Sequence, residues 1–236
     1  MRHSKYLFAI VGITFGLLMP IASAQADDND IVPVNANAFG NTYGEWSAQW
    51  WQWLQSIPKT VNPLLDNTGA NCAQQQSGPV FYLVGVGTFN SPPITRKCTV
   101  PAGKALFFPI LNTIWGAGQG DCDPTVPGIA CNLAVLRGLA AGSMDSVTLK
   151  AVIDGEPVDN LRQQRVQSPV LTVTFPADST GAPKGTYTPN VSDGYWLLLS
   201  PLSAGRQHTI YFKGVITDGI FKGFVVEVTY KLFVQK

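Results

Sequence analysis

From residue 146 to its C-terminus, the chain alternates short apolar segments with residues that form turns. Asp154-Gly155, Asp193-Gly194 and Asp218-Gly219 separate some of these segments, and such residues tolerate the backbone angles that tight turns require. We predict strands at residues 147–153, 162–166, 170–175, 195–199, 207–212 and 224–234. Short strands at this spacing, with no helix between them, indicate an antiparallel β-sandwich.

The N-terminal residues 1–24 have the pattern of a secretory signal peptide. Arg2 and Lys5 precede an apolar run at residues 6–19, and Ala22-Ser23-Ala24 supplies the small residues of a cleavage site. Gln25 rather than a cysteine comes directly after the expected cleavage at Ala24, so a lipid-modified terminus is not expected. We therefore expect a soluble mature protein of about 212 residues, periplasmic or secreted, with no transmembrane segment after cleavage.

The charge of the mature chain excludes some classes of partner. Loss of Arg2 and Lys5 leaves 14 basic against 15 acidic residues, and no half of the chain is strongly basic. Nucleic acids and acidic membranes bind clustered Lys and Arg, so neither is an expected partner. A charged fraction of 13% beside 45% hydrophobic residues is typical of a well-buried globular protein.

Four cysteines, Cys72, Cys98, Cys122 and Cys131, follow the signal peptide. An even number in an oxidising compartment favours two disulfides. Three pairings are possible, and we favour Cys72 with Cys98 and Cys122 with Cys131, because neighbours in sequence meet most readily. A metal site is not expected, since the sequence has no Cys-x-x-Cys spacing and the mature chain has a single histidine, His208.

A tryptophan-rich amphipathic helix is predicted at residues 43–57, after a flexible arm at residues 25–41. Thr42 and Glu45 form a capping box at its start, and Pro58 ends it. At 100° per residue, one face carries the aromatic and aliphatic side chains Tyr43, Trp46, Trp50, Trp53, Leu54 and Ile57. We expect this face to dock on the sandwich. Trp51 falls at the edge of the face.

The rest of the first half is predicted to be shorter elements. Strands are expected at 80–86, 95–100 and 104–110, the last two joined into a hairpin by Pro101-Ala102-Gly103. A second short helix is expected at 131–141. Together these features predict one β-rich domain over residues 42–236, in which 42–145 supplies the helix, the hairpin and the disulfide loops and 146–236 the sandwich strands.

Two resemblances extend this interpretation. Residues 146–236, with the segment 202–210 leading into a strand, resemble the immunoglobulin-like sandwich modules of exported bacterial proteins. Tyr43-Gly44-Glu45-Trp46-Ser47 with Trp50-Trp51-Gln52-Trp53, and also Val100-Pro101-Ala102-Gly103-Lys104, resemble an uncharacterised family of secreted bacterial proteins. The first resemblance implies an immunoglobulin-like sandwich, with a jelly-roll-like one as the alternative. The second implies export and no particular activity.

Enzymatic chemistry has few residues to draw on. A serine or cysteine hydrolase needs a histidine base, and we interpret His208 as structural. A glycosidase needs two carboxyl groups, and the spacing of Glu45, Glu156, Glu227 and Asp193 selects no pair, so no catalytic residue is assigned. No cofactor is expected. Calcium is the alternative, and its ligands would be Asp121-Cys122-Asp123 with Asn132, or Asp154, Glu156 and Asp159. For both clusters the preferred interpretation is that these polar side chains solvate turns.

Binding remains, because aromatic rings on a rigid sandwich stack on sugars or line apolar pockets. The candidate ligand-binding residues are Trp51, Trp115, Tyr195 and Trp196. We expect one of the adjacent pair Tyr195 and Trp196 to point outward. The sequence favours an exported non-catalytic protein that binds a glycan or another envelope or extracellular protein. The alternatives are a carboxylate-dependent polysaccharide hydrolase or lyase, and a structural subunit of an envelope or extracellular assembly.

Overall fold

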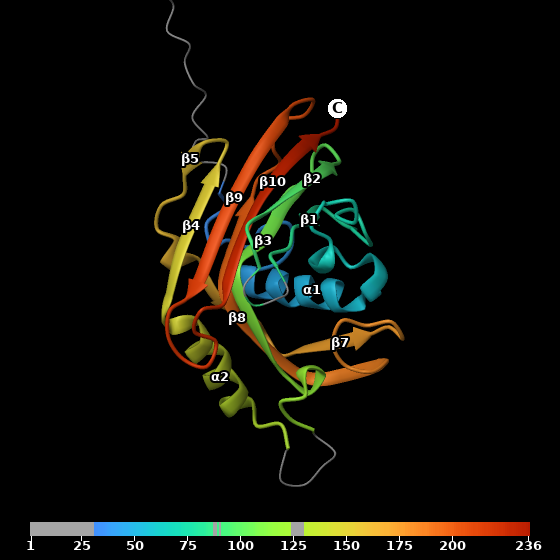
Figure 1. Cartoon of the computed structure of the whole chain (residues 1–236), viewed down its shortest axis with the longest axis vertical. Helices are drawn as coiled ribbons and strands as arrows, with labels where there is room; N and C mark the ends of the chain where they lie inside the picture. The colour runs from blue at the N-terminus through green and yellow to red at the C-terminus, as the bar shows by residue number, and fades with distance from the viewer. Residues whose placement is uncertain (1–30, 87–88, 90, 124–129) are drawn as a thin grey trace, which may run out of the picture.

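A computed structural model describes residues 31–86, 89, 91–123 and 130–236 of the chain (Figure 1). The predicted signal peptide lies outside these residues. The described part is mainly β, with two five-stranded sheets and two α-helices. Neither helix is long and apolar enough to cross a membrane. The helices are α1 (Tyr43–Ser56) and α2 (Leu133–Asp145), and 3₁₀ turns occupy Lys59–Val61, Pro63–Leu65, Ala117–Gln119 and Leu161–Gln164.

The two sheets are each assembled from strands that lie far apart in the sequence. The first sheet has the order β1-β3-β8-β6, with β7 also paired to β8, and the second has the order β2-β10-β9-β4-β5. The strands of the first sheet are β1 (Val80–Tyr82), β3 (Ala105–Gly116), β8 (Gly185–Leu199), β6 (Arg165–Gln167) and β7 (Leu171–Phe175). Those of the second are β2 (Ile94–Val100), β10 (Val225–Val234), β9 (Gln207–Ile216), β4 (Val147–Ile153) and β5 (Glu156–Pro157).

Both sheets are mixed, whereas the sequence predicted antiparallel strands throughout. β1 runs parallel to β3 in the first sheet, and β2 runs parallel to β10 in the second. The predicted hairpin at 95–110 is also wrong, because its two strands, β2 and β3, belong to different sheets. The two strands enter different sheets because their burial differs. β2 alternates buried and exposed residues, so only one of its faces is covered. β3 is buried on both faces over its first seven residues and needs a layer on each side.

Several strands differ from their predicted bounds: β1 ends at Tyr82 rather than at 86, and β9 continues to Ile216 rather than ending at 212. β8 begins at Gly185, ten residues before the predicted start at 195. The apolar pattern missed this part because it carries the polar residues Asn190, Ser192 and Asp193, which are nevertheless buried. The predicted strand at 162–166 is a 3₁₀ turn followed by the short strand β6. Helix α2 spans 133–145 rather than the predicted 131–141.

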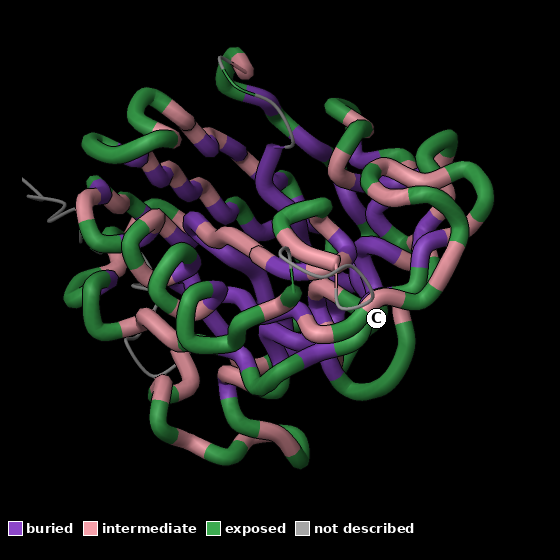
Figure 2. Tube along the Cα trace, turned by 90° about the horizontal axis from the view of Figure 1, so that it is seen from below, coloured by how far each residue is buried: buried purple, intermediate pink, exposed green. Residues whose placement is uncertain are grey.

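The two sheets pack against each other, and α1 packs on the outer side of the first sheet (Figure 1). Phe108 of β3 stacks on Phe212 of β9 with centroids 5.2 Å apart, which joins the two sheets. The neighbouring Phe107 points the other way and stacks on Trp196, with centroids 5.0 Å apart, in the cluster beneath α1. Figure 2 shows the buried residues running through this interior.

The predicted helix and its capping box are present. The side chain of Glu45 accepts a hydrogen bond from the backbone N–H of Thr42 at 2.7 Å, and the backbone N–H of Glu45 donates to Thr42 Oγ1 at 3.3 Å. The hydroxyl of Thr42 also donates to this carboxylate at 2.8 Å, and the backbone and hydroxyl bonds from Thr42 lower the pKa of Glu45. All six residues of the predicted face are buried. The opposite side is partly covered as well, since Ala48 packs on β7 and Gln55 is only 7% exposed.

Part of the arm predicted to be flexible is attached to the first sheet. Ile31 forms an isolated bridge with Leu199, and the N–H of Val32 donates to the carbonyl of Leu198 at 2.8 Å. The hydroxyl of Tyr43 donates to the carbonyl of Val32. The apolar side chains of this segment pack on the cluster beneath α1. The segment is too short to give a periodic signal in the sequence.

Both predicted disulfides are present with the favoured pairing. Cys72 is bonded to Cys98 and connects the loop after α1 with β2, and Cys122 is bonded to Cys131 just before α2. Cys72 and Cys98 are buried between the sheets.

Candidate functional site

The four aromatic residues singled out in the sequence do not form one surface. Tyr195 and Trp196 lie on opposite faces of β8, and both are buried, at 2% and 0% exposure. The expected outward-facing ring is therefore absent from this pair, because the second sheet covers one face of β8 and α1 covers the other. The hydroxyl of Tyr195 donates to the carbonyl of Met144 at 3.0 Å. Both residues belong to the core.

Trp51 and Trp115 line two separate cavities. Trp51 lies on α1 beside a cavity of about 190 Å³, and Trp115 lies near the end of β3 beside one of about 230 Å³. In both rings the indole Nε1 is covered but has no hydrogen-bond partner among the described residues. The cavity beside Trp115 also carries Leu139, Ile220 and Phe221.

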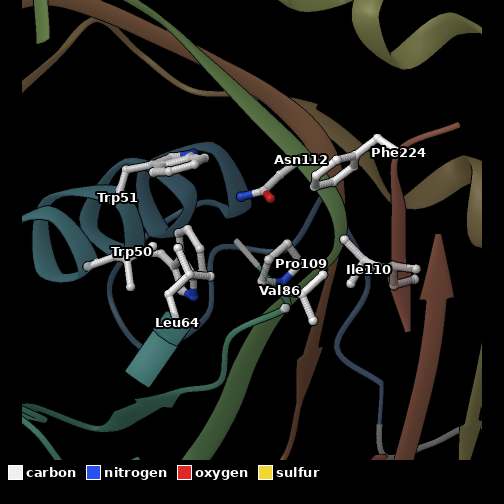
Figure 3. Close-up of a pocket in the computed structure, with 11 residues that line it drawn as sticks. Trp50, Trp51, Leu64, Val86, Pro109, Ile110, Asn112 and Phe224 are labelled. Carbon is white, nitrogen blue, oxygen red and sulfur yellow. The ribbon is translucent and has the colours of Figure 1, made fainter. Parts of the chain in front are cut away.

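The cavity beside Trp51, here called the Trp51 cavity, lies between α1, β3 and the start of β10 (Figure 3). Its walls are mostly apolar, and its lining residues are Trp50, Trp51, Leu54, Leu64, Gly85, Val86, Pro109, Ile110, Asn112, Phe224 and Val226. Figure 3 shows Trp51 on one side, Leu64 and Pro109 on the other, and the amide of Asn112 extending from β3 toward α1. The cavity therefore has apolar sides and a polar edge.

Two residues that line the cavity carry N–H donors without acceptors. The Nδ2 of Asn112 is covered and unpartnered within the described chain, as is the Nε1 of Trp51. The other three tryptophans of α1 differ: Trp46, Trp50 and Trp53 donate to the backbone carbonyls of Ala38, Leu83 and Gln74 at 2.9, 2.8 and 2.9 Å. Because a buried donor without an acceptor costs about 1–3 kcal/mol, two such donors in one cavity call for an explanation.

An irregularity in β3 places Asn112 at this edge. The pairing of β3 with β8 shifts between Pro109 and Leu111, and the same stretch supplies three residues of the cavity wall. Asn112 is paired with Gly194 of β8, where a Cβ atom would lie 2.6 Å from the Cβ of Asn112. Glycine is therefore required at 194 for the close approach that holds Asn112 in position.

A buried arginine supports the opposite wall. Arg96 is 1% exposed, and its guanidinium donates to the carbonyls of Leu64 and Gly85, at 3.4 and 2.7 Å, which belong to two lining residues. It also donates to the carbonyls of Asp66 and Val84 and to the hydroxyl of Tyr230, at 2.7, 2.9 and 3.1 Å. Planar guanidinium groups suit such multiple contacts. Arg96 thus fixes the two loops that form this wall.

The sequence analysis did not single out Arg96 or Asn112, although each has a local signal. In β2, Arg96 falls on the same alternating face as Ile94, Cys98 and Val100, which places it inward. Asn112 directly follows a run of seven apolar residues at the start of β3. A charged or amide residue at a position that the pattern predicts to be buried indicates a specific polar contact.

The predicted carboxyl groups are not brought together. Glu45 caps α1, and Glu227 bonds to Lys213 at 2.7 Å and Tyr211 at 2.9 Å. Asp193 is 1% exposed and accepts from Arg165 at 2.8 Å and Gln167 at 3.0 Å. Burial alone would lower the pKa of Arg165, but its bonds to Asp193 and Asp145 raise it. The lining of the Trp51 cavity contains no carboxylate.

His208 lies between a serine and an aspartate. Its Nδ1 is 2.6 Å from Oδ2 of Asp154, and its Nε2 is 3.2 Å from Oγ and 3.0 Å from the carbonyl oxygen of Ser203. The ring of His208 is only 4% exposed, and its Nε2 contacts the backbone carbonyl of Ser203 as well as the hydroxyl. We therefore interpret His208 as a structural link between the loop at Ser203 and the turn at Asp154.

The two clusters considered as alternatives for calcium make other contacts in the described part of the chain. The described residues contain no group of three or more His, Cys, Asp or Glu side chains placed to hold a metal ion. In the first cluster Asp121 accepts from the N–H of Gly116 at 2.9 Å. In the second, Asp154 contacts His208 and accepts from the N–H of Thr209 at 2.6 Å. Both contacts are those of carboxylates that stabilise turns.

Comparisons with protein-family models, with curated proteins and with solved structures find no match for this chain.

Proposed function

We propose that this chain is an exported, non-catalytic binding protein that holds a small ligand in the Trp51 cavity. The observation that carries the proposal is the pair of covered N–H donors, Trp51 Nε1 and Asn112 Nδ2, on an otherwise apolar cavity wall. Ligand sites combine mostly apolar walls with a few polar groups that fix orientation. Acceptor atoms of a ligand would satisfy both donors.

The walls and donors suggest the chemistry of that ligand. It presents acceptor oxygens to Trp51 and Asn112, and an apolar face to Leu64 and Pro109. A single sugar residue combines hydroxyl oxygens with an apolar ring face that packs on aromatic rings. The volume of about 190 Å³ favours one sugar residue over a longer oligosaccharide, and carbohydrate is therefore the ligand class that we propose.

Export is proposed from features outside the cavity. The N-terminal segment has the pattern of a signal peptide, and the two disulfides suit an oxidising compartment such as the periplasm or the extracellular space. The paired sheets are compatible with an immunoglobulin-like or jelly-roll-like sandwich, and membership of the uncharacterised family of secreted bacterial proteins remains a proposal.

A structural role in an envelope or extracellular assembly is the second candidate. It is favoured by large hydrophobic side chains exposed on α2 and near the loop before β10, namely Leu133, Val135, Leu139, Ile220 and Phe89. Exposed apolar groups of this kind are typical of protein interfaces. The polysaccharide hydrolase is less supported, because none of the four cavities described in this structure is lined by two carboxylates.

A glycan array probed with the wild-type protein, Trp51→Ala and Trp115→Ala tests the binding proposal. We expect wild type and Trp115→Ala to bind the same uncharged glycans, and Trp51→Ala to lose them. The second tryptophan is a matched control, because it too lines a cavity with an unpartnered indole nitrogen. A wild-type protein that binds no glycan would remove carbohydrate as the ligand, and binding unaffected by Trp51→Ala would remove the cavity as the site.

A further inference from the structure

We propose that a groove on the outer face of the second sheet binds an acidic polysaccharide. The groove has a volume of about 420 Å³ and is lined by Lys97, Cys98, Thr99, Gln207, Lys231, Leu232 and Phe233. It shares no lining residue with the Trp51 cavity. This proposal therefore goes beyond the proposed function and does not depend on it.

The strand register gathers the polar side chains of the groove on one face. Lys231 of β10 is paired with Lys97 of the parallel strand β2. Phe233, two residues further on, is paired with Thr99 on one side and Gln207 on the other. Residues two apart in a strand point to the same face, so these five side chains share the outer face. Cys98 and Leu232 point inward and are buried.

Lys97 and Lys231 place two positive charges opposite each other on neighbouring strands. Directly opposed like charges on neighbouring strands are destabilising, and within the described chain neither Lys97 nor Lys231 forms an ion pair. A lysine elsewhere on this face has a partner: Lys213 lies 2.7 Å from Glu227. The groove lining contains no Asp or Glu. An anionic ligand would supply the missing countercharge.

The other groove residues favour a sugar chain among anionic ligands. Phe233 is 44% exposed and offers a ring face on which a sugar can stack. Gln207 and Thr99 add an amide and a hydroxyl that can bond to sugar hydroxyls. A polyuronate repeats a carboxylate on each sugar, which suits two lysines beside an aromatic ring. A nucleic acid needs a wider basic surface than two lysines on a chain with 14 basic and 15 acidic residues after signal cleavage.

The test compares binding to polygalacturonate, with neutral dextran as the uncharged probe. Lys97→Gln combined with Lys231→Gln removes the two charges. Lys184→Gln combined with Lys222→Gln is the matched control, because both of its lysines are exposed and neither lines the groove. We expect the first pair to weaken polygalacturonate binding about tenfold, as two exposed ion pairs would, and the control pair to change it less than twofold. Dextran should not bind.

Two further measurements separate a binding role from a structural one. Removing the like-charge pair should leave the thermal unfolding temperature unchanged or raised, so weaker binding cannot come from unfolding. Phe233→Ala should weaken polygalacturonate binding about fivefold. The proposal is overturned if wild type does not bind polygalacturonate, if it binds phosphatidylglycerol vesicles instead, or if the control pair loses as much affinity as the groove pair.

Discussion

The amide nitrogen of Asn112 and the indole nitrogen of Trp51 border the same cavity, and neither donates a hydrogen bond within the described part of the protein. The two residues lie on β3 and α1, 61 positions apart in the sequence, and the packing of α1 on the first sheet brings them together. Each of the other three tryptophans of α1 bonds to a backbone carbonyl. Among the tryptophans of α1 the missing partner is therefore particular to Trp51, although the indole nitrogens of Trp115 and Trp196 also lack one among the described residues.

The first prediction concerns the energetic cost of Asn112. Asn112→Leu removes the unpartnered donor and keeps a similar side-chain volume, so the free energy of unfolding should rise by about 1 kcal/mol. Urea denaturation measures this change. Asn190→Leu is the control, because Asn190 bonds to Tyr187 and Gly118, both at 3.0 Å, and should lose about 2 kcal/mol or more. Equal destabilisation by the two variants would show that Asn112 has a structural partner.

The second prediction concerns Arg96. Arg96→Met should lower the free energy of unfolding by about 3–5 kcal/mol, because it leaves the carbonyls of Leu64, Asp66 and Gly85 without the arginine donor. The Val84 carbonyl and the Tyr230 hydroxyl lose one bond each but still bond to each other. Arg96→Lys should recover less than half of this loss, since one ammonium group cannot reach all the acceptors. Urea denaturation again provides the measurement. A lysine variant as stable as wild type would contradict the role given to the guanidinium.

The helix α1 and the two disulfides were predictable from local sequence signals. The helix face from Tyr43 to Ile57 repeats at 100° per residue, and the Thr42–Glu45 capping box marks its start. The same periodicity set Trp51 apart from the other helix tryptophans, which is why it was found as a candidate. Cysteine order was enough to suggest the two disulfides.

The sheet order was not predictable, because it depends on contacts between distant segments. β2 and β3 are separated by a four-residue turn typical of a hairpin, yet they enter different sheets. The first part of β8 is polar, so its sequence indicates a loop. It is a buried strand because Arg165 and Gln167, on the neighbouring strand, donate hydrogen bonds to Asp193. The partner of Trp51 in the cavity, Asn112, follows from the same long-range packing.

The third prediction concerns acid stability. The bond from Lys213 lowers the pKa of Glu227, and the bonds from Thr42 lower that of Glu45, both from an ordinary value of 4.5. A depressed folded pKa contributes stability that is present above 4.5 and is lost as the pH falls through the folded value. The thermal unfolding temperature should therefore fall below pH 4.5. Glu45→Gln with Glu227→Gln should flatten this fall, and an unchanged slope would contradict it.

The fourth prediction compares the disulfides. The loops they close span 26 and 9 residues, and loop entropy gives stabilisations of about 3.5 and about 2.6 kcal/mol. Cys72→Ser with Cys98→Ser should therefore destabilise more than Cys122→Ser with Cys131→Ser, and burial of the first pair between the sheets adds to the difference. Urea denaturation of both double variants measures it. A larger loss in the second variant would contradict the ranking.

The most direct test of the Trp51 cavity is the ¹⁵N–¹H spectrum of the indole groups, recorded as glucose, galactose and N-acetylglucosamine are each added at millimolar concentration. We predict that at least one sugar shifts the indole resonance of Trp51 and the side-chain amide of Asn112. The resonances of Trp46 and Trp53, whose N–H groups bond to backbone carbonyls, should stay in place. A sugar that binds the protein without moving the Trp51 resonance would contradict the account.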